Sequence, residues 1–281
     1  MLLNSFDDWS PLREVIVGSA ANYLSHEREL SFNLFFYDQF ADDENRFDKM
    51  YYPRVSQTGG GATPAGSRQR HAIKQRYVEE LNEDVEGLVD VLRSLGVTVH
   101  RPMTMQPNQQ IQTLAWSASV IPPLNIRDNA LIIGDEIIET PPMVRSRYHE
   151  NQFLANVFGA YFTNGARWTV MPRPLMSDMS FDQSYMLASP GGPAELITEP
   201  QPSPYDVGLE MMFDAAQCLR LGRDILVNVS TKNHELAVQW LERHLEGRFR
   251  LHRVHRLADN HIDSKVLALR PGLLLVRNQA V

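Results

Sequence analysis

The sequence predicts an α/β fold assembled from one repeated unit, in which strands are followed by a helix, a glycine and a further strand. Apolar residues recur at helical spacing in three separate segments, each segment closes on a glycine, and a short strand follows each glycine. The glycines are Gly96, Gly165 and Gly247, which are 69 and 82 residues apart. This pattern is typical of a supersecondary unit that is repeated with insertions of variable length.

The first unit begins with a strand over residues 13–18 (REVIVG), which leads into a long polar stretch. Within that stretch, residues 56–67 (SQTGGGATPAGS) have the composition of a flexible loop. A phosphate-binding loop is not expected there, because no strand leads into the glycines and no Lys-Ser or Lys-Thr pair follows them.

A helix is predicted from Tyr77 onward, and Gly96 takes the position just after its end. Residues 97–100 (VTVH) then form a strand. The side chains expected on the inner face of this helix are Val78, Leu81, Val85, Leu88 and Leu92.

The second and third units follow the same plan. The second is expected to consist of strands at residues 130–133 and 136–138, a helix at 151–162, and a strand at 167–171. The third is expected to consist of a strand at residues 224–229, a helix at 234–245, and a strand at 249–255.

The closing segment is predicted to be a hairpin. Residues 265–269 and 273–276 are apolar, and Arg270-Pro271-Gly272 forms the turn between them. Neither a helix nor a return strand follows this hairpin in the sequence. We therefore expect residues 1–281 to form a single domain that stops within its fourth unit and lacks its last unit or units.

The composition argues against several classes of protein. The formal net charge is −7 without a long basic run, so nucleic acid is not an expected partner. The N-terminus carries acids where a signal peptide has bases, and no apolar run approaches about 18 residues, so neither secretion nor a membrane span is expected. Cys218 is the single cysteine, which permits no disulfide within the chain and favours a cytoplasmic location.

Three acids, Asp128, Asp214 and Asp263, stand beside predicted strands or at their heads. In a cyclic arrangement of repeats, equivalent strand ends converge on one mouth, where three carboxylates would repel one another unless a cation lay between them. A planar guanidinium suits such a site, because its forked N–H donors pair with carboxylates. Taken singly, each acid is more commonly a turn residue or a helix cap.

His261 lies two residues before Asp263 at the head of an apolar run. In a strand this spacing would place both side chains on one face, and a histidine beside a carboxylate is suited to proton transfer. No metal site is predicted, because His252 and His255 are three residues apart on a strand and would point to opposite faces.

Five stretches together resemble the amidinotransferases, the family of arginine:glycine amidinotransferase and inosamine-phosphate amidinotransferase. They occur in the family's order and span nearly the whole chain: DDWSPLREVIVGSA, RDNALIIGDEIIETPPMVRSRYHE, FDAAQCLRLGRDIL, LAVQWLERHL and HIDSKVLALRPGLLLV. The resemblance implies a pentein-type fold, which is a ring of five ββαβ units (an α/β propeller) around a central channel. In this chain we expect the ring to be incomplete at the C-terminus.

The resemblance also implies a reaction that needs no cofactor. A cysteine thiolate attacks the guanidinium carbon of L-arginine and expels ornithine, and the resulting amidino-cysteine passes its amidino group to an acceptor amine. By resemblance, Asp214 of the FDAA motif and His261 of the HID motif are catalytic, with His261 as general acid and base. Asp128 and Asp263 match substrate-binding acids.

The resemblance also suggests a role in substrate binding for two arginines, but less specifically. Arg145 and Arg147 of the RSR run could bind a substrate carboxylate, although a structural role in salt bridges is equally expected.

The sequence departs from the family at two places. Asn125-Ile126 stands where the family usually has Cys-Pro. More importantly, the family's nucleophilic cysteine lies near its C-terminus in a Gly-Gly-Gly-Phe-His-Cys type of motif, which this sequence lacks. We expect that cysteine beyond residue 281. Cys218 is expected in a short helical turn, as a buried structural residue and not as the nucleophile.

Two alternatives to an amidinotransferase stay open from the sequence. One is an arginine-deiminase-like guanidino hydrolase, for which water is the acceptor. The other is a non-catalytic guanidino-binding or interaction protein without a nucleophile. The expected partners are L-arginine and an acceptor amine that the sequence does not identify, and a homodimer is compatible with it.

Overall fold

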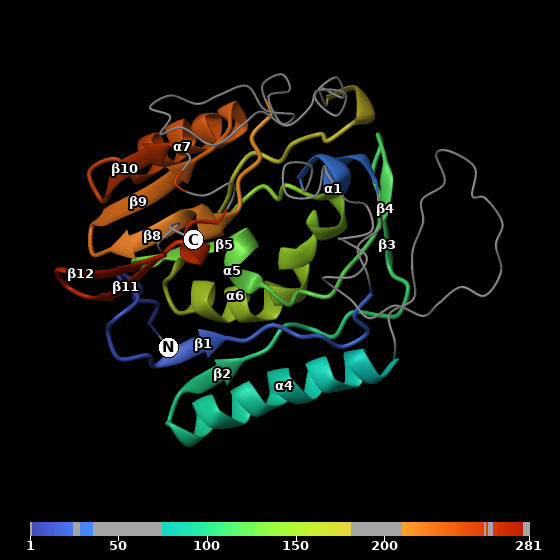
Figure 1. Cartoon of the computed structure of the whole chain (residues 1–281), viewed down its shortest axis with the longest axis horizontal. Helices are drawn as coiled ribbons and strands as arrows, with labels where there is room; N and C mark the ends of the chain where they lie inside the picture. The colour runs from blue at the N-terminus through green and yellow to red at the C-terminus, as the bar shows by residue number, and fades with distance from the viewer. Residues whose placement is uncertain are drawn as a thin grey trace.

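The computed structural model describes residues 2–24, 29–35, 75–180, 210–255, 257 and 261–277. The loop predicted over residues 56–67 lies outside the described residues. Several short sheets and their helices surround a central region that contains the short helix α5 (Ile126–Asn129), as Figure 1 shows. The repeated unit predicted from the sequence is present in this arrangement.

One complete unit follows α5. Strand β5 (Ala130–Ile133) pairs antiparallel with β6 (Glu136–Glu139), and β6 pairs parallel with β7 (Arg167–Val170). Helix α6 (Ala155–Thr163) connects β6 to β7, after a 3-10 turn, η2 (Glu150–Leu154). The helix predicted over residues 151–162 is therefore confirmed, except that it starts as a tighter turn.

The next complete unit repeats this topology. Strand β8 (Cys218–Leu221) pairs antiparallel with β9 (Asp224–Val229), and β9 pairs parallel with β10 (Arg250–His255) across helix α7 (Lys232–Leu245). The first strand, β8, was not expected from the sequence. Cys218 was predicted in a helical turn and instead begins this strand, because the turn η5 (Ala215–Gln217) ends one residue earlier.

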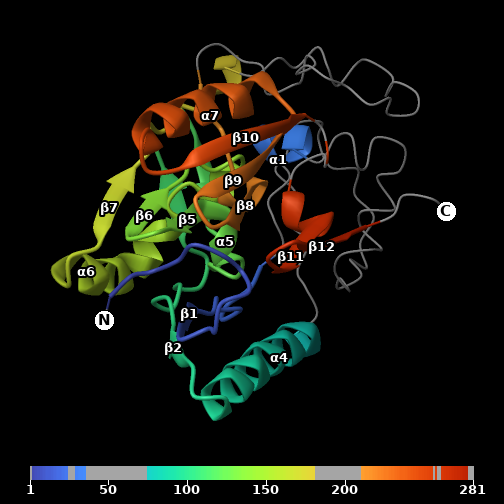
Figure 2. The ribbon, with the colours of Figure 1, turned by 90° about the vertical axis from the view of Figure 1, so that its left-hand side faces the viewer.

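Two further units are present in part. Strands β1 (Glu14–Ile16) and β2 (Thr98–His100) form a parallel pair, and α4 (Gln75–Ser94) leads into β2. Strands β11 (Val266–Arg270) and β12 (Leu273–Val276) form the predicted antiparallel hairpin. In both Figure 1 and Figure 2, this red hairpin lies between β8 and the unit that contains β1, β2 and α4.

The expected inner face of α4 is wrong at one position. Leu88 was predicted to face inward, yet 52% of it is exposed, while the neighbouring Val89 is fully buried. The helix packs on the small two-stranded sheet, and the amide of Asn82 reaches the carbonyl of Ala20 (3.2 Å). Because α4 packs on only two short strands, it buries fewer of its apolar side chains than the helical periodicity of the sequence implies.

The helix ends agree with the sequence signals. Gly96, Gly165 and Gly247 all have positive φ (79°, 97° and 74°), a conformation in which glycine is favoured after a helix end. At the start of α7, the hydroxyl of Thr231 accepts a hydrogen bond from the backbone N–H of His234 (3.1 Å), which caps the first turn. The units therefore begin and end where local chemistry predicts.

The remaining elements lie outside these strand pairs. They are α1 (Leu30–Phe35), β3 (Gln110–Gln112), β4 (Ser117–Ser119), η1 (Arg145–Arg147) and η3 (Asp178–Ser180). Strands β3 and β4 form a separate two-stranded sheet. One buried apolar cluster joins β5, β6, β8, β9 and α7, so the two complete units share a core.

The turns that open successive units meet at the centre. Helix α5 contacts η5, and η5 contacts η6 (Ile262–Ser264), the turn that precedes β11. The N-terminal segment crosses the two complete units as well, since Ser5 exchanges two backbone hydrogen bonds with Gly134 and Gly222 donates one to Phe6 (2.9 Å). Side chains at α5, η5 and η6 are thereby brought close together.

Candidate active site

Asp214 and His261 meet although 47 residues separate them. Asp214 precedes η5 and His261 precedes η6, so the two residues occupy equivalent positions in successive units. Nε2 of His261 lies 2.9 Å from Oδ2 of Asp214. The carboxylate is buried, whereas the imidazole is 22% exposed, so the histidine is the more accessible member of the pair.

Asp128, in α5, supplies a second carboxylate to the same imidazole. Its Oδ1 lies 3.7 Å from Nδ1 of His261, and its Oδ2 accepts a hydrogen bond from Nη1 of Arg147 (2.6 Å). Arg147 also donates to the buried Glu150 (2.8 Å) and to the carbonyl of Asn125 (2.8 Å). The convergence of Asp128 with Asp214 and His261 is confirmed, and the donors of Arg147 are largely occupied within the protein.

The surroundings of His261 favour its charged form. Burial opposes that charge, but the hydrogen bond with Asp214 and the negative charges of Asp214, Asp128 and Asp263 outweigh it and raise the pKa of His261 above its ordinary value. An imidazole with a raised pKa is protonated to a larger extent at neutral pH. It is therefore equipped to donate a proton to a leaving amine.

Asp263 lies at the more exposed edge of the site. It belongs to η6 and not to a strand, so the expectation that His261 and Asp263 share one strand face is wrong. Its Oδ2 lies 3.3 Å from Nε of Arg127, and both side chains are about one third or more exposed, at 33% and 41%. Arg127 donates from Nη2 to the carbonyl of Cys218 (3.2 Å), which ties α5 to β8.

Arg145 is one of the largest fully buried side chains. Its guanidinium donates to the carbonyl of Met176 (2.9 and 2.6 Å) and to Asp178 (2.6 Å), and it lies 3.3 Å from Glu29. It also lies over the ring of Trp116, 5.4 Å from the centroid. These contacts favour the salt-bridge role over the carboxylate-binding role for Arg145.

Cys218 has the properties of a core residue. Its side chain belongs to the cluster shared by the two complete units and is 3% exposed. Burial raises the pKa of the Cys218 thiol to about 12, against the opposing charges of Arg127 and Arg220. At pH 7 this thiol is held in its protonated form, whereas the thiolate is the form that acts as a nucleophile.

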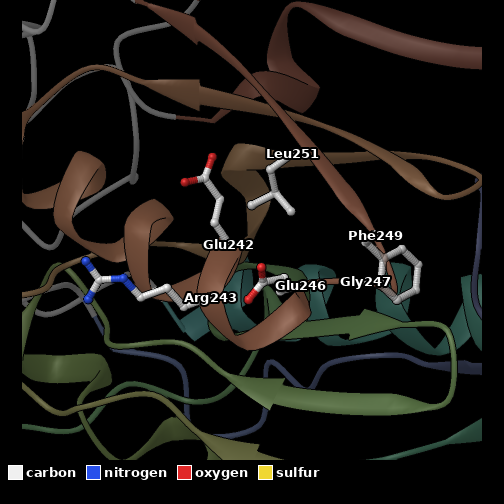
Figure 3. A pocket seen from close by; sticks show the side chains of 6 residues that line it. All are labelled: Glu242, Arg243, Glu246, Gly247, Phe249 and Leu251. Atoms are coloured by element: carbon white, nitrogen blue, oxygen red, sulfur yellow. The ribbon is translucent and has the colours of Figure 1, made fainter.

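A concave surface elsewhere on the molecule is separate from these residues. Figure 3 shows it at the end of α7 and the start of β10. Its lining residues are Glu242, Arg243, Glu246, Gly247, Phe249 and Leu251. None of the acids around His261 lines this concave surface. The concave surface and the candidate active site are therefore two different places on the molecule.

The described part of the chain shows neither a metal-binding cluster nor a helix that could cross a membrane. No group of three or more His, Cys, Asp or Glu side chains within it is placed to hold a metal ion. None of its helices combines the length and the apolar character that crossing a bilayer requires.

Comparisons with known proteins decide the family. No protein-family model matches the chain. Inosamine-phosphate amidinotransferase 1 of Streptomyces griseus is 32% identical over 281 residues, which are 100% of this chain and 71% of that protein. The chain belongs to the amidinotransferase family. Glycine amidinotransferase of Danio rerio, named as mitochondrial, is 30% identical over 271 residues, which are 96% of this chain and 59% of that protein.

Solved amidinotransferase structures show the same fold. The structure of inosamine-phosphate amidinotransferase from Streptomyces griseus matches with a TM-score of 0.76 at 29% identity, covering 98% of this chain and 69% of that one. An amidinotransferase of the saxitoxin biosynthetic pathway from Microseira wollei matches with a TM-score of 0.71 at 28% identity, with the same coverage. The pentein-type fold predicted from the sequence is therefore confirmed.

Several residues around the site were missed from the sequence. Arg127 and Glu150 stand at the two ends of the family-like stretch over residues 127–150, but no role was predicted for either. Their roles come from their contacts, those of Arg127 with the carbonyl of Cys218 and of Glu150 with Arg147. His234 is fully buried, and burial, together with the charge of His261, lowers its pKa to about 3. Nδ1 of His234 accepts from the backbone N–H of Ser230 (3.2 Å), so this imidazole is neutral and holds the start of α7.

Proposed function

We propose that this chain forms the guanidinium-binding and proton-transferring part of an amidinotransferase that moves the amidino group of L-arginine to an acceptor amine. The observation that carries the proposal is the imidazole of His261, bonded to Asp214 and flanked by Asp128. The carboxylates can pair with the planar guanidinium of a substrate, and the partly exposed imidazole beside them can carry a proton. Membership of the amidinotransferase family supports the same chemistry.

The acids have separate roles in this proposal. Asp214 holds His261 in its charged form, and Asp128 and Asp263 pair with the guanidinium of the substrate. Arg147 is reassigned from substrate binding to positioning, because it directs Oδ2 of Asp128 away from the imidazole and leaves Oδ1 facing it. Carboxylates fixed by such contacts need little reorganisation when a cation binds.

In this proposal the reaction has two steps. A thiolate attacks the guanidinium carbon of L-arginine, the bond from that carbon to Nε breaks, and imidazolium His261 gives its proton to that nitrogen, so that ornithine leaves. The acceptor amine attacks the amidino-cysteine and gives a proton to His261, and the thiolate leaves. His261 ends each turnover protonated, as it began.

We place the thiolate outside residues 1–281. Cys218 is the only cysteine in the sequence, and its buried thiol with a raised pKa is unsuited to attack. The 281-residue chain should therefore bind L-arginine weakly, with a dissociation constant on the order of 1 mM, and should not turn it over.

Product analysis tests this proposal. L-arginine and an amine such as glycine or lysine are incubated with the 281-residue chain, with its Cys218→Ser variant, and with a longer protein that carries a cysteine in a following unit. We expect ornithine and a guanidinylated amine from the longer protein alone, and citrulline would indicate the hydrolase instead. Ornithine release by the 281-residue chain that is lost in Cys218→Ser would contradict the assignment of the nucleophile.

A further inference from the structure

Arg127 lies between two carboxylates at the exposed edge of the site. Its Nε is 3.3 Å from Oδ2 of Asp263, and its Nη2 is 4.0 Å from Oδ2 of Asp8. Both distances exceed the 2.7–2.9 Å that is typical of a charge-assisted hydrogen bond. The side chain of Arg127 is 41% exposed, whereas that of Arg147 is 11% exposed and donates to Asp128 at 2.6 Å, so Arg127 is held less tightly than Arg147.

Asp8 has a carboxylate oxygen that could receive Arg127. One oxygen of Asp8, Oδ1, accepts a hydrogen bond from Arg220. The other, Oδ2, is buried and has no hydrogen-bond partner among the described residues. Leaving a buried carboxylate oxygen unpaired is costly, so a cation that moved to it would be favoured there.

We propose that Arg127 is a specificity-determining residue that pairs with Asp263 and turns to Asp8 when a guanidinium ligand pairs with Asp263 in its place. The proposal rests on the proposed function, because it takes the guanidinium of L-arginine as the ligand of Asp263. Nη2 of Arg127 donates to the carbonyl of Cys218 (3.2 Å), and a displacement of about 1 Å would bring it within hydrogen-bond distance of Asp8, so the exchange would weaken or replace that neutral hydrogen bond.

This exchange would keep Asp263 paired with a cation throughout. A neutral ligand of the same shape, such as the ureido group of L-citrulline, could not replace Arg127, because it would leave Asp263 without a positive partner. Arg127 would thus favour guanidinium over ureido ligands through competition and not through direct contact. The N-terminal segment that carries Asp8 would become part of the binding site.

Dissociation constants of L-arginine for the 281-residue chain test the exchange, measured by ligand-observed NMR. Arg127→Gln removes the competitor, and we expect L-arginine to bind about two- to five-fold more tightly, which is the range of a partly exposed ion pair. Asp8→Asn weakens the alternative position and should reduce affinity by a similar factor. The double variant should bind as Arg127→Gln does.

Asp7→Asn is the matched control, because it removes a neighbouring charge whose side chain bonds to Ser10 and the backbone of Trp9. It should leave the affinity unchanged. Weaker binding by Arg127→Gln would overturn the inference and leave the proposed function standing, since it would show that Arg127 positions Asp263 instead of competing for it. Absence of L-arginine binding by every folded variant would contradict the proposed function, and this inference with it.

Discussion

The two sides of the site differ in how their charges are held. On the inner side, Arg147 joins Asp128 and Glu150 through hydrogen bonds of 2.6 and 2.8 Å, and all three side chains are nearly buried. On the outer side, Arg127 and Asp263 are 3.3 Å apart and partly exposed. The inner side therefore provides fixed geometry for the imidazole, whereas the outer side has the freedom that ligand entry requires.

The difference follows from the packing around each side. Asp128 belongs to α5, which contacts β5, η2 and η5, and Arg147 belongs to η1, which contacts β4. Their side chains are only 9% and 11% exposed, so breaking the pair would leave a charge with little access to water. Asp263 belongs to η6, which leads into a hairpin whose second strand is exposed along its length. Charges on that side can exchange partners with water at little cost.

Breaking the inner side should have the largest effect. Arg147→Met leaves Asp128 and Glu150 buried without their cation, and we expect the free energy of unfolding to fall by about 3–5 kcal/mol. Arg127→Met, the matched change on the outer side, should cost less than about 1 kcal/mol. Urea denaturation of both variants measures the free energy of unfolding. Equal losses of stability would contradict the proposed difference between the inner and the outer side.

The pair of Asp214 and His261 should come next, with a dependence on pH. Because the folded pKa of His261 lies above its unfolded value of 6.5, its interaction with Asp214 stabilises the fold fully below pH 6.5 and weakens as the pH rises through the folded pKa. Asp214→Asn should cost about 1.5–3 kcal/mol at pH 6, and less at pH 9. Urea denaturation of the wild type and of Asp214→Asn between pH 6 and pH 9 measures this loss of stability. A loss that stays constant or grows with pH would contradict the raised pKa of His261.

Cys218→Ser should have a smaller effect. It places a hydroxyl in the cluster shared by the two complete units, with an expected cost of about 1 kcal/mol. The affinity for L-arginine should not change, because the thiol has no part in the proposed site. A calorimetric melting curve measures the first quantity and an L-arginine titration the second, and a large loss of affinity would place this sulfur at the ligand.

Asp263→Asn should have the smallest effect on stability. Its side chain is partly exposed, so the free energy of unfolding should change by no more than about 0.5 kcal/mol. The affinity for L-arginine should nevertheless fall, since Asp263 is proposed to pair with the guanidinium. Thermal denaturation together with binding checks both parts, and a stability loss as large as that of Arg147→Met would make Asp263 a structural residue.

Much of the fold could be predicted from the sequence because its signals are local. Glycines after helix ends and apolar periodicity predicted α6, α7 and the strands β7, β9 and β10 within a few residues. Strand β8 was missed, since its sequence CLRL is short and follows a turn directly. Whether Leu88 or Val89 is buried depends on what packs against α4, and periodicity alone contains no such information.

The site could be predicted only in part. Its acids and His261 were found through short motifs, and their convergence followed from the repeated unit. Arg127 was not found as a partner of Asp263 or Asp8, because both contacts cross long sequence separations. Glu150 lies only three residues after Arg147, and the sequence does not show that this short-range pair is buried beside Asp128. The cytoplasmic location and the homodimer stay predictions, and the acceptor amine was not predicted.

The response of the His261 imidazole to L-arginine tests the central claim most directly. NMR spectra of the 281-residue chain are recorded during titration with L-arginine and, as the matched control, with neutral L-citrulline. We predict that L-arginine shifts the His261 resonances and lowers the pKa of this imidazole, because a second cation then shares Asp128 and Asp263. L-citrulline should cause no comparable change. If L-arginine binds and leaves His261 unchanged, these residues do not form the guanidinium site.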